Sequence, residues 1–128
     1  MMDPVERAFD LVSNYDVVVA RQHAREMARM MGFGLTDQTR IATAVSEVAR
    51  RALGNQGQIT FRVVIDGGRQ GVECTCVGVE WGSSPQEQSV HIPGGTQGIE
   101  RLMDDFEFLG RRDGPRRTVV MRKWLRLA

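Results

Sequence analysis

Few residues in this chain have the types and spacing that chemistry requires, and the first is a carboxylate at helical spacing from two arginines. Glu47 precedes Arg50 and Arg51 by three and four residues. Side chains at this spacing are neighbours on a helix surface. Two interpretations fit: a surface ion pair between Glu47 and one arginine, which is the common fate of helix charges, or a chemical role for the carboxylate.

Two cysteines and two histidines are the remaining candidates. Cys74 and Cys76 lie two residues apart in a strand pattern and therefore share one face. Buried core thiols are the simpler interpretation, and a metal or redox role is the alternative. Two cysteines provide neither a disulfide framework nor a four-ligand zinc site. His23 and His91 have no evident acid or nucleophile beside them, so we interpret both as structural or surface residues.

The composition is that of an ordinary globular domain. The chain has 128 residues, 17 Lys and Arg against 16 Asp and Glu, and a formal net charge of +1. This length favours one domain over residues 1–128. No apolar run approaches a membrane span, and the first residues do not resemble a secretory signal, so a cytoplasmic protein is expected. Near-neutral charge argues against nucleic-acid binding.

Basic residues are concentrated near the C-terminus. One interpretation is the solvated face of a terminal hairpin, and the other is a surface for phosphate or an acidic partner. The residues concerned are Arg111, Arg112, Arg116, Arg117, Arg122, Lys123 and Arg126.

The first half of the chain predicts one strand and two helices. Residues 15–19 are β-branched and typical of a strand. Residues 20–31 follow with apolar side chains at helical spacing, and the glycines at 32 and 34 should end this helix. A second helix is expected from Thr36, as its N-cap, to about Leu53. Its buried stripe would comprise Ile41, Ala42, Val45, Val48, Ala49 and Ala52.

The second half predicts two hairpins separated by a helix. Asp66-Gly67-Gly68 is a strong hairpin turn, and residues 80–96 form a loop long enough to be functional. These elements predict an α+β two-layer sandwich, with three helices on one face of a mixed sheet. Strands are expected at 59–65, 72–79, 106–109 and 118–125, and a helix at 97–105.

Four stretches resemble the anti-sigma-factor serine/threonine kinases, with the greatest similarity to the switch kinases released from bacterial stressosomes. They are Asp16-Val17-Val18-Val19-Ala20-Arg21-Gln22, the helix 35–50 around Val45-Ser46-Glu47-Val48-Ala49-Arg50, then Gly98-Ile99-Glu100-Arg101-Leu102-Met103-Asp104-Asp105-Phe106, and Thr118-Val119-Val120-Met121-Arg122-Lys123-Trp124. The resemblance covers about residues 14–126, and its ungapped stretches match in the same order.

The resemblance implies a histidine-kinase-like ATPase (Bergerat) fold that holds ATP and Mg²⁺ between the second helix and a lid loop. It implies a kinase that phosphorylates serine or threonine on a STAS-type antagonist domain, and that binds a phosphatase or a sigma factor. Glu47 would be the catalytic general base. Relatives in the wider superfamily often dimerise, which leaves a homodimer open.

At the metal position the sequence departs from the family. An asparagine four residues after the glutamate coordinates Mg²⁺ in the family, and Arg51 stands there in this chain. Two unit charges 4 Å apart interact by about 4 kcal/mol at an effective dielectric near 20, so an arginine at this position opposes the metal. Alternatively, Arg51 contacts phosphate directly and partly replaces the metal.

The glycine motifs also depart from the family. An Asp-x-Gly-x-Gly motif aligns with Gly78 to Gly82, so Gly78 lacks the carboxylate that binds adenine, and Trp81 adds bulk that could fill the adenine pocket. A lost charge-assisted hydrogen bond is worth about 1.5–3 kcal/mol. The second motif is reduced to residues 93–98, which retain Gly95, Thr96 and Gly98 as candidate phosphate contacts, and Thr118 matches a threonine that opens the last strand.

These departures favour a degenerate homologue with weak or no ATP binding and doubtful Mg²⁺ binding. It would act in stress-response and sigma-factor regulation mainly by binding an antagonist domain or a phosphatase. The alternative is an active kinase whose metal site is remodelled by Arg51, so whether the chain is an enzyme stays open. Sigma-factor sequestration is a third hypothesis.

Overall fold

The structure is a computed structural model that describes residues 6–81, 96–109 and 116–126. None of the helices in this part of the chain has the length and apolar character needed to cross a membrane. In chain order the elements are β1 (Arg7–Leu11), α1 (Asn14–Met31), α2 (Leu35–Arg50), β2 (Gly57–Asp66), β3 (Arg69–Glu80), α4 (Thr96–Leu102), β4 (Asp105–Leu109) and β5 (Arg116–Trp124).

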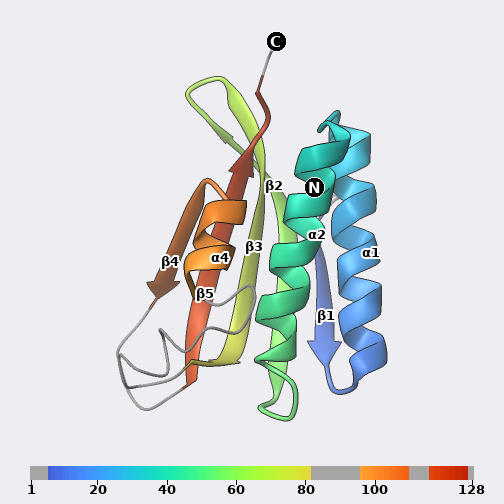
Figure 1. Cartoon of the computed structure of the whole chain (residues 1–128), viewed down its shortest axis with the longest axis vertical. Helices are drawn as coiled ribbons and strands as arrows, with labels where there is room; N and C mark the ends of the chain where they lie inside the picture. Colours follow the sequence, from blue (N-terminus) through green and yellow to red (C-terminus); the bar gives the residue numbers. More distant parts are fainter. Residues whose placement is uncertain (1–5, 82–95, 110–115, 127–128) are drawn as a thin grey trace.

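The strands form one five-stranded sheet in the order β1-β2-β3-β5-β4. Every neighbouring pair is antiparallel, so the α+β class is confirmed, whereas the expected mixed sheet is wrong. The reason lies in the connections. The antiparallel helices α1 and α2 return the chain to the end of the sheet where β1 finished, and β2 must therefore run back beside β1 (Figure 1).

The helices lie on one face of this sheet, as Figure 1 shows. Alternate residues of each strand point toward them, because successive side chains of a strand face opposite sides. The apolar stripe predicted for α2 is confirmed, since all six of its residues are buried. The strand residues that pack into the same core include Ile59, Phe61, Cys74, Cys76, Val119 and Met121.

The strand expected at residues 15–19 is wrong, because this segment is the first turn of α1. Asp16 accepts hydrogen bonds from the backbone N–H groups of Val12 and Ser13, both at 2.9 Å, which closes the helix start as a cap does. Within residues 15–19 the core takes only Val17. Val17 is followed in the core by Ala20 and Ala24, which is the spacing of one helix face. Packing therefore overrides the β propensity of the valines.

Glycines mark the end of α1 and the start of α2. Gly32 takes the left-handed conformation, with φ of 99°, and ends α1 as predicted. Helix α2 begins at Leu35 with Gly34 as its N-cap, so the expected N-cap at Thr36 is wrong. Gln38 accounts for the difference, since its side-chain amide donates to the Phe33 carbonyl at 2.8 Å and closes the turn before the helix.

The hairpin turn and the last three elements are confirmed to within a few residues. Gly67 and Gly68 both have positive φ, 57° and 84°, as a two-residue turn matched to the twist of its strands requires. The predicted turn at 113–115 and most of the predicted loop 80–96 lie outside the described residues.

The C-terminal basic residues are not one solvated face. Lys123 is buried, and its ammonium donates to the Leu102 carbonyl at 3.0 Å. It also lies 3.7 Å from Asp37 and 3.6 Å from Asp104. On the opposite face of β5, Arg122 pairs with Glu73 at 2.8 Å. Lys123 thus joins the start of α2, the end of α4 and β5 from inside the protein.

We predict that Lys123→Met destabilises the fold by about 3–5 kcal/mol, because Asp37 and Asp104 would lose their partly buried cation. Arg126→Met is the matched control. Arg126 also pairs with Asp104, at 2.9 Å, but its side chain is 73% exposed, and exposed pairs contribute about 0–1 kcal/mol. Urea denaturation of both variants measures the difference, and equal losses would contradict the role assigned to Lys123.

Candidate functional site

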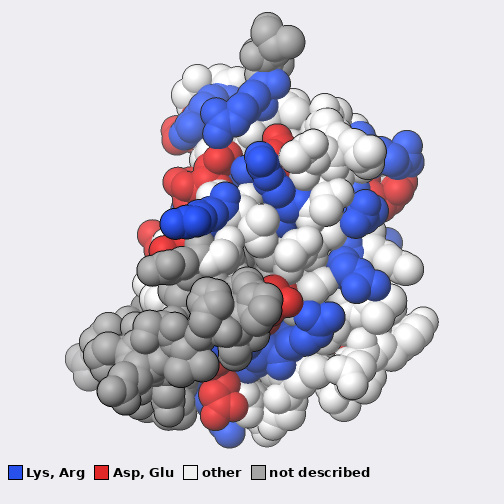
Figure 2. Space-filling model, in the orientation of Figure 1, with Lys and Arg blue, Asp and Glu red and all other residues white. Residues whose placement is uncertain are grey.

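Glu47 lies in the last turns of α2 and is already paired. Its carboxylate accepts a hydrogen bond from Arg50 at 3.0 Å, and the Glu47 side chain is 22% exposed. The ion pair that the spacing suggested therefore forms with Arg50. Similar three-residue pairs join Glu26 to Arg29 and Asp37 to Arg40, and on the helix-covered face positive and negative side chains are interspersed (Figure 2).

Arg51 turns away from Glu47 and lies on an aromatic ring. Its guanidinium carbon is 4.4 Å from the centroid of the Trp81 ring, and Trp81 is only 1% exposed. Backbone atoms hold this arrangement, because the N–H of Glu80 donates to the Arg51 carbonyl at 2.7 Å. A cation over an aromatic ring contributes about 0.5–2 kcal/mol. The end of α2 and the end of β3 are thus fastened together.

Trp81 continues into an aromatic cluster on β4. Its ring lies 5.7 Å from Phe106 and 5.4 Å from Phe108, centroid to centroid. Arg117, at the start of β5, places its guanidinium 4.8 Å from the Phe108 ring. We call Arg51, Trp81, Phe108 and Arg117 the cation–aromatic stack. Four separate elements meet there, at the end of α2 where the nucleotide was expected.

The two arginines of the stack do not use all of their hydrogen-bond donors among the described residues. The Nε atoms of Arg51 and Arg117 are buried and have no hydrogen-bond partner among the residues that the structure describes. The sequence analysis placed Arg117 only in the C-terminal basic cluster and missed its contact with this site, although strand alternation could have found it. Val119 is a core position, and residues 117 and 119 of one strand face the same side.

Two of the predicted site residues, Gly78 and Thr118, lie at one cavity, and Glu47 does not line it. Thr118 pairs with Leu109 in the β4–β5 ladder, and its side chain alternates with that of Val119, which faces the helices. Both predicted residues line a cavity of about 410 Å³ at the end of the sheet. Glu47 and Arg51 line neither this cavity nor the larger one at the opposite end of the sheet.

Gly78 has a structural reason to be glycine. Its φ is 80°, and it lies at an irregularity of β3 between Cys76 and Val79. A Cβ atom there would lie 3.0 Å from the Asn55 carbonyl oxygen. An aspartate at this position would therefore strain the backbone.

The other predicted glycine-motif residues are only partly described. Gly98 lies inside α4, and no atom lies within 4 Å of the position a Cβ would take. Thr96 begins α4. Gly82 and Gly95 lie outside the described residues, as does His91.

The described residues do not fit a Mg²⁺–nucleotide site. Mg²⁺ requires oxygen ligands in octahedral geometry, whereas the guanidinium of Arg51 stands where the resemblance places the metal ligand. At the adenine position, Gly78 brings no carboxylate. In residues 6–81, 96–109 and 116–126, no three His, Cys, Asp or Glu side chains form a cluster that could hold a metal ion by themselves. Burial raises the pKa of Cys76 to about 12 and also raises the pKa of Cys74, so these thiols are core residues. His23 packs between the rings of Phe9 and Phe61, at 5.1 and 5.2 Å.

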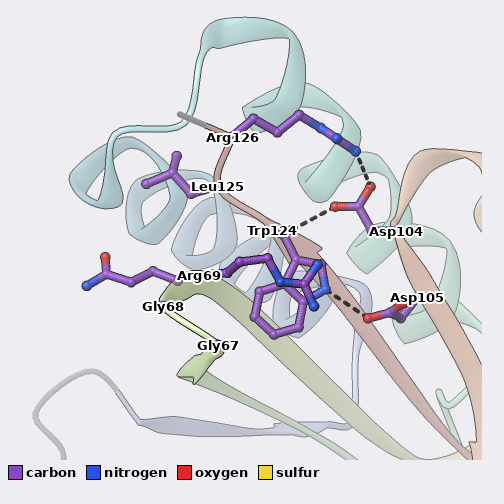
Figure 3. Close-up of a pocket in the computed structure, with 9 residues that line it drawn as sticks. Gly67, Gly68, Arg69, Asp104, Asp105, Trp124, Leu125 and Arg126 are labelled. Carbon is purple, nitrogen blue, oxygen red and sulfur yellow. Dashed lines mark hydrogen bonds and ion pairs between the residues drawn. The ribbon is translucent and has the colours of Figure 1, made fainter. Parts of the chain in front are cut away.

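A larger cavity, of about 1070 Å³, lies at the opposite end of the sheet (Figure 3). Its charged groups are mutually paired. Asp104 accepts from the Trp124 backbone and from Arg126, Asp105 accepts from the Trp124 indole at 2.9 Å, and Arg69 lies 4.1 Å from the Trp124 ring. This arrangement joins two of the stretches that carry the family resemblance, and its role is structural.

Two of the predicted glycines give opposite predictions for stability. Gly98→Ala should stabilise the protein by about 0.5–1 kcal/mol, because the Cβ has room and alanine favours a helix. Gly78→Ala should destabilise it by more than about 1 kcal/mol, because of the positive φ and the close Asn55 carbonyl. Thermal melts followed by circular dichroism measure both changes, and a loss of stability in Gly98→Ala would contradict the open environment.

Comparison with known proteins agrees with the resemblance seen in the sequence. No protein-family model matches the chain. The chain is 34% identical, over 126 residues, to the serine/threonine-protein kinase RsbT of Bacillus subtilis (strain 168), and the match covers 91% of this chain and 94% of that relative. With this identity over nearly its whole length, the chain belongs to the RsbT-like family of anti-sigma-factor serine/threonine kinases.

Proposed function

We propose that this protein acts in sigma-factor regulation mainly by binding other proteins, with weak or no ATP binding. The observation that carries the proposal is the contact between Arg51 and Trp81. The arginine replaces the family's metal-binding asparagine, the tryptophan lies in the altered glycine motif, and the two side chains pack on each other 4.4 Å apart.

ATP bound at the family's position would displace the buried Trp81 ring. Trp81 is 1% exposed and packs on two phenylalanines, and losing a buried tryptophan costs about 3–5 kcal/mol. Nucleotide binding that had to expose this ring would be weaker by roughly two to four orders of magnitude, since about 1.4 kcal/mol corresponds to a factor of ten. A Mg²⁺ ion beside Arg51 would add repulsion.

We further propose the histidine-kinase-like ATPase sandwich as the fold. Support comes from helices that cover a single face of the sheet (Figure 1) and from α2, which carries Glu47 and Arg51 at the end where the family holds its ligand. In this arrangement the degenerate site is a closed version of the family's nucleotide site.

The proposed partners are a STAS-type antagonist domain and a phosphatase, in the cytoplasm. The helices retain the family's sequence, and they present side chains suited to contact. Tyr15 and Met30 of α1 are each 72% exposed, and Leu35 at the start of α2 is 73% exposed. Large apolar side chains at the surface are suited to burial in a protein interface.

An active kinase is the second candidate, and the exposure of Glu47 favours it. The Glu47 carboxylate is partly open to solvent and its partner Arg50 is exposed, so a substrate hydroxyl has access to it. In that case Arg51 would leave Trp81 and contact the phosphates in place of a metal.

Association with purified STAS-type antagonist domains from the same organism, measured by biolayer interferometry, separates the two candidates. We expect equal affinity with and without ATP and Mg²⁺, and an unchanged affinity in Glu47→Gln. Radiolabelled ATP should transfer no phosphate to the antagonist. Transfer that Glu47→Gln abolishes would establish the kinase, and absence of association with every antagonist domain would contradict the binding role.

A further inference from the structure

The smaller cavity lies on the face of the sheet that the helices leave uncovered. Val77, Thr118 and Leu109 line it, and their side chains alternate with those of Cys76, Val119 and Phe108, which pack toward the helices. Its volume of about 410 Å³ falls in the range of ligand-binding clefts. The Arg51–Trp81 contact is on the other side of the sheet, and Arg117 is the residue that this cavity shares with the cation–aromatic stack.

The charged side chains that line this cavity, among the described residues, are two arginines. The described lining residues are Asn55, Gln56, Val77, Gly78, Leu109, Arg116, Arg117 and Thr118. The guanidinium of Arg117 turns to the Phe108 ring in the cation–aromatic stack, so Arg116 supplies the positive charge on the uncovered face. Arg116 is exposed and lies opposite Glu80 in the β3–β5 ladder, but no ion pair joins these two side chains or links Arg116 to any other described residue. Elsewhere on the same face the arginines are neutralised, because Glu73 pairs with Arg62 at 2.6 Å and with Arg122 at 2.8 Å.

Exposed apolar side chains flank the same cavity. Val77 is 47% exposed and Leu109 is 48% exposed. The neighbouring apolar residues on this face are covered, with Val120 at 3% and Trp124 at 8%. Among the described residues of the uncovered face, large exposed apolar side chains therefore occur beside the unpaired arginine and not elsewhere.

We propose that this cavity is a docking site for a partner protein segment that carries an acidic side chain next to an aliphatic one. The carboxylate would pair with Arg116 and accept from the Thr118 hydroxyl, while the aliphatic side chain covers Val77 and Leu109. A partner segment fits better than a free inorganic anion, because a free anion would leave both apolar walls in water. Charge complementarity of this kind mainly sets specificity and association rate.

A peptide-display selection on the immobilised full chain tests the proposal, because random peptides sample the chemistry of a partner whose identity is open. Random dodecapeptides are selected on the wild type and counter-selected on Arg116→Glu. We expect enriched peptides to place Asp or Glu within two residues of Leu, Ile, Val or Phe. The best synthetic peptide should bind Arg116→Glu at least about tenfold more weakly than wild type, the equivalent of one charged contact.

The control is Arg25→Glu, which changes an exposed arginine of α1 far from the cavity and should leave peptide affinity within about twofold. Amide chemical-shift mapping should place the peptide at Val77, Leu109 and Thr118. The proposal is wrong if no peptide is enriched, if the enriched peptides lack acidic residues, or if Arg116→Glu leaves binding intact. It is also wrong if inorganic phosphate alone saturates the same amides below millimolar concentration, which would indicate a small-anion site.

Discussion

The close packing of α2 is the constraint on which the rest of this molecule depends. Its buried face includes small side chains, with Ala42, Ala44 and Ala49 essentially inaccessible to solvent, and small side chains allow a helix to pack closely on its neighbours. A cationic side chain lies at each end. Lys123 reaches Asp37 in the first turn, and Arg51 leaves the last turn toward Trp81.

Two departures from the family that the resemblance indicates, Arg51 and Trp81, meet at the C-terminal end of α2. An arginine in place of a metal ligand would be unfavourable beside Mg²⁺, but here its guanidinium finds the face of an aromatic ring. A tryptophan in a glycine motif would be unfavourable in an open loop, but here it is buried against Phe106 and Phe108. The two side chains pack on each other, and this mutual support is the basis of the proposal that the nucleotide site is closed. Arg117 extends the same packing from β5.

The sequence predicted the parts of the fold that periodicity and turn chemistry control. The α2 stripe and the turn at Gly67-Gly68 follow from local rules, and both were found as expected. The strand predicted at residues 15–19 was wrong because these valines lie in the first turns of a helix whose start is capped by Asp16. Cap geometry is weakly marked in sequence. The strand β1 went unrecognised because only Leu11 of its five residues is fully buried.

Site prediction from sequence was limited by strand orientation. Thr118 was chosen by motif alignment, yet its neighbour Arg117 is the residue that reaches the aromatic cluster, because a shift of one position in a strand reverses the face. Gly78 illustrates the converse, since a missing carboxylate is visible in sequence, whereas the left-handed backbone that requires glycine is visible only in three dimensions.

Calorimetric titration of the purified protein with ATP and ADP, with and without Mg²⁺, tests the central claim most directly. If Arg51 and Trp81 close the nucleotide site, no saturable heat should appear up to millimolar nucleotide under either condition. Micromolar binding that depends on Mg²⁺ would contradict the account, because it would require the metal to be held beside Arg51 and the buried ring to give way.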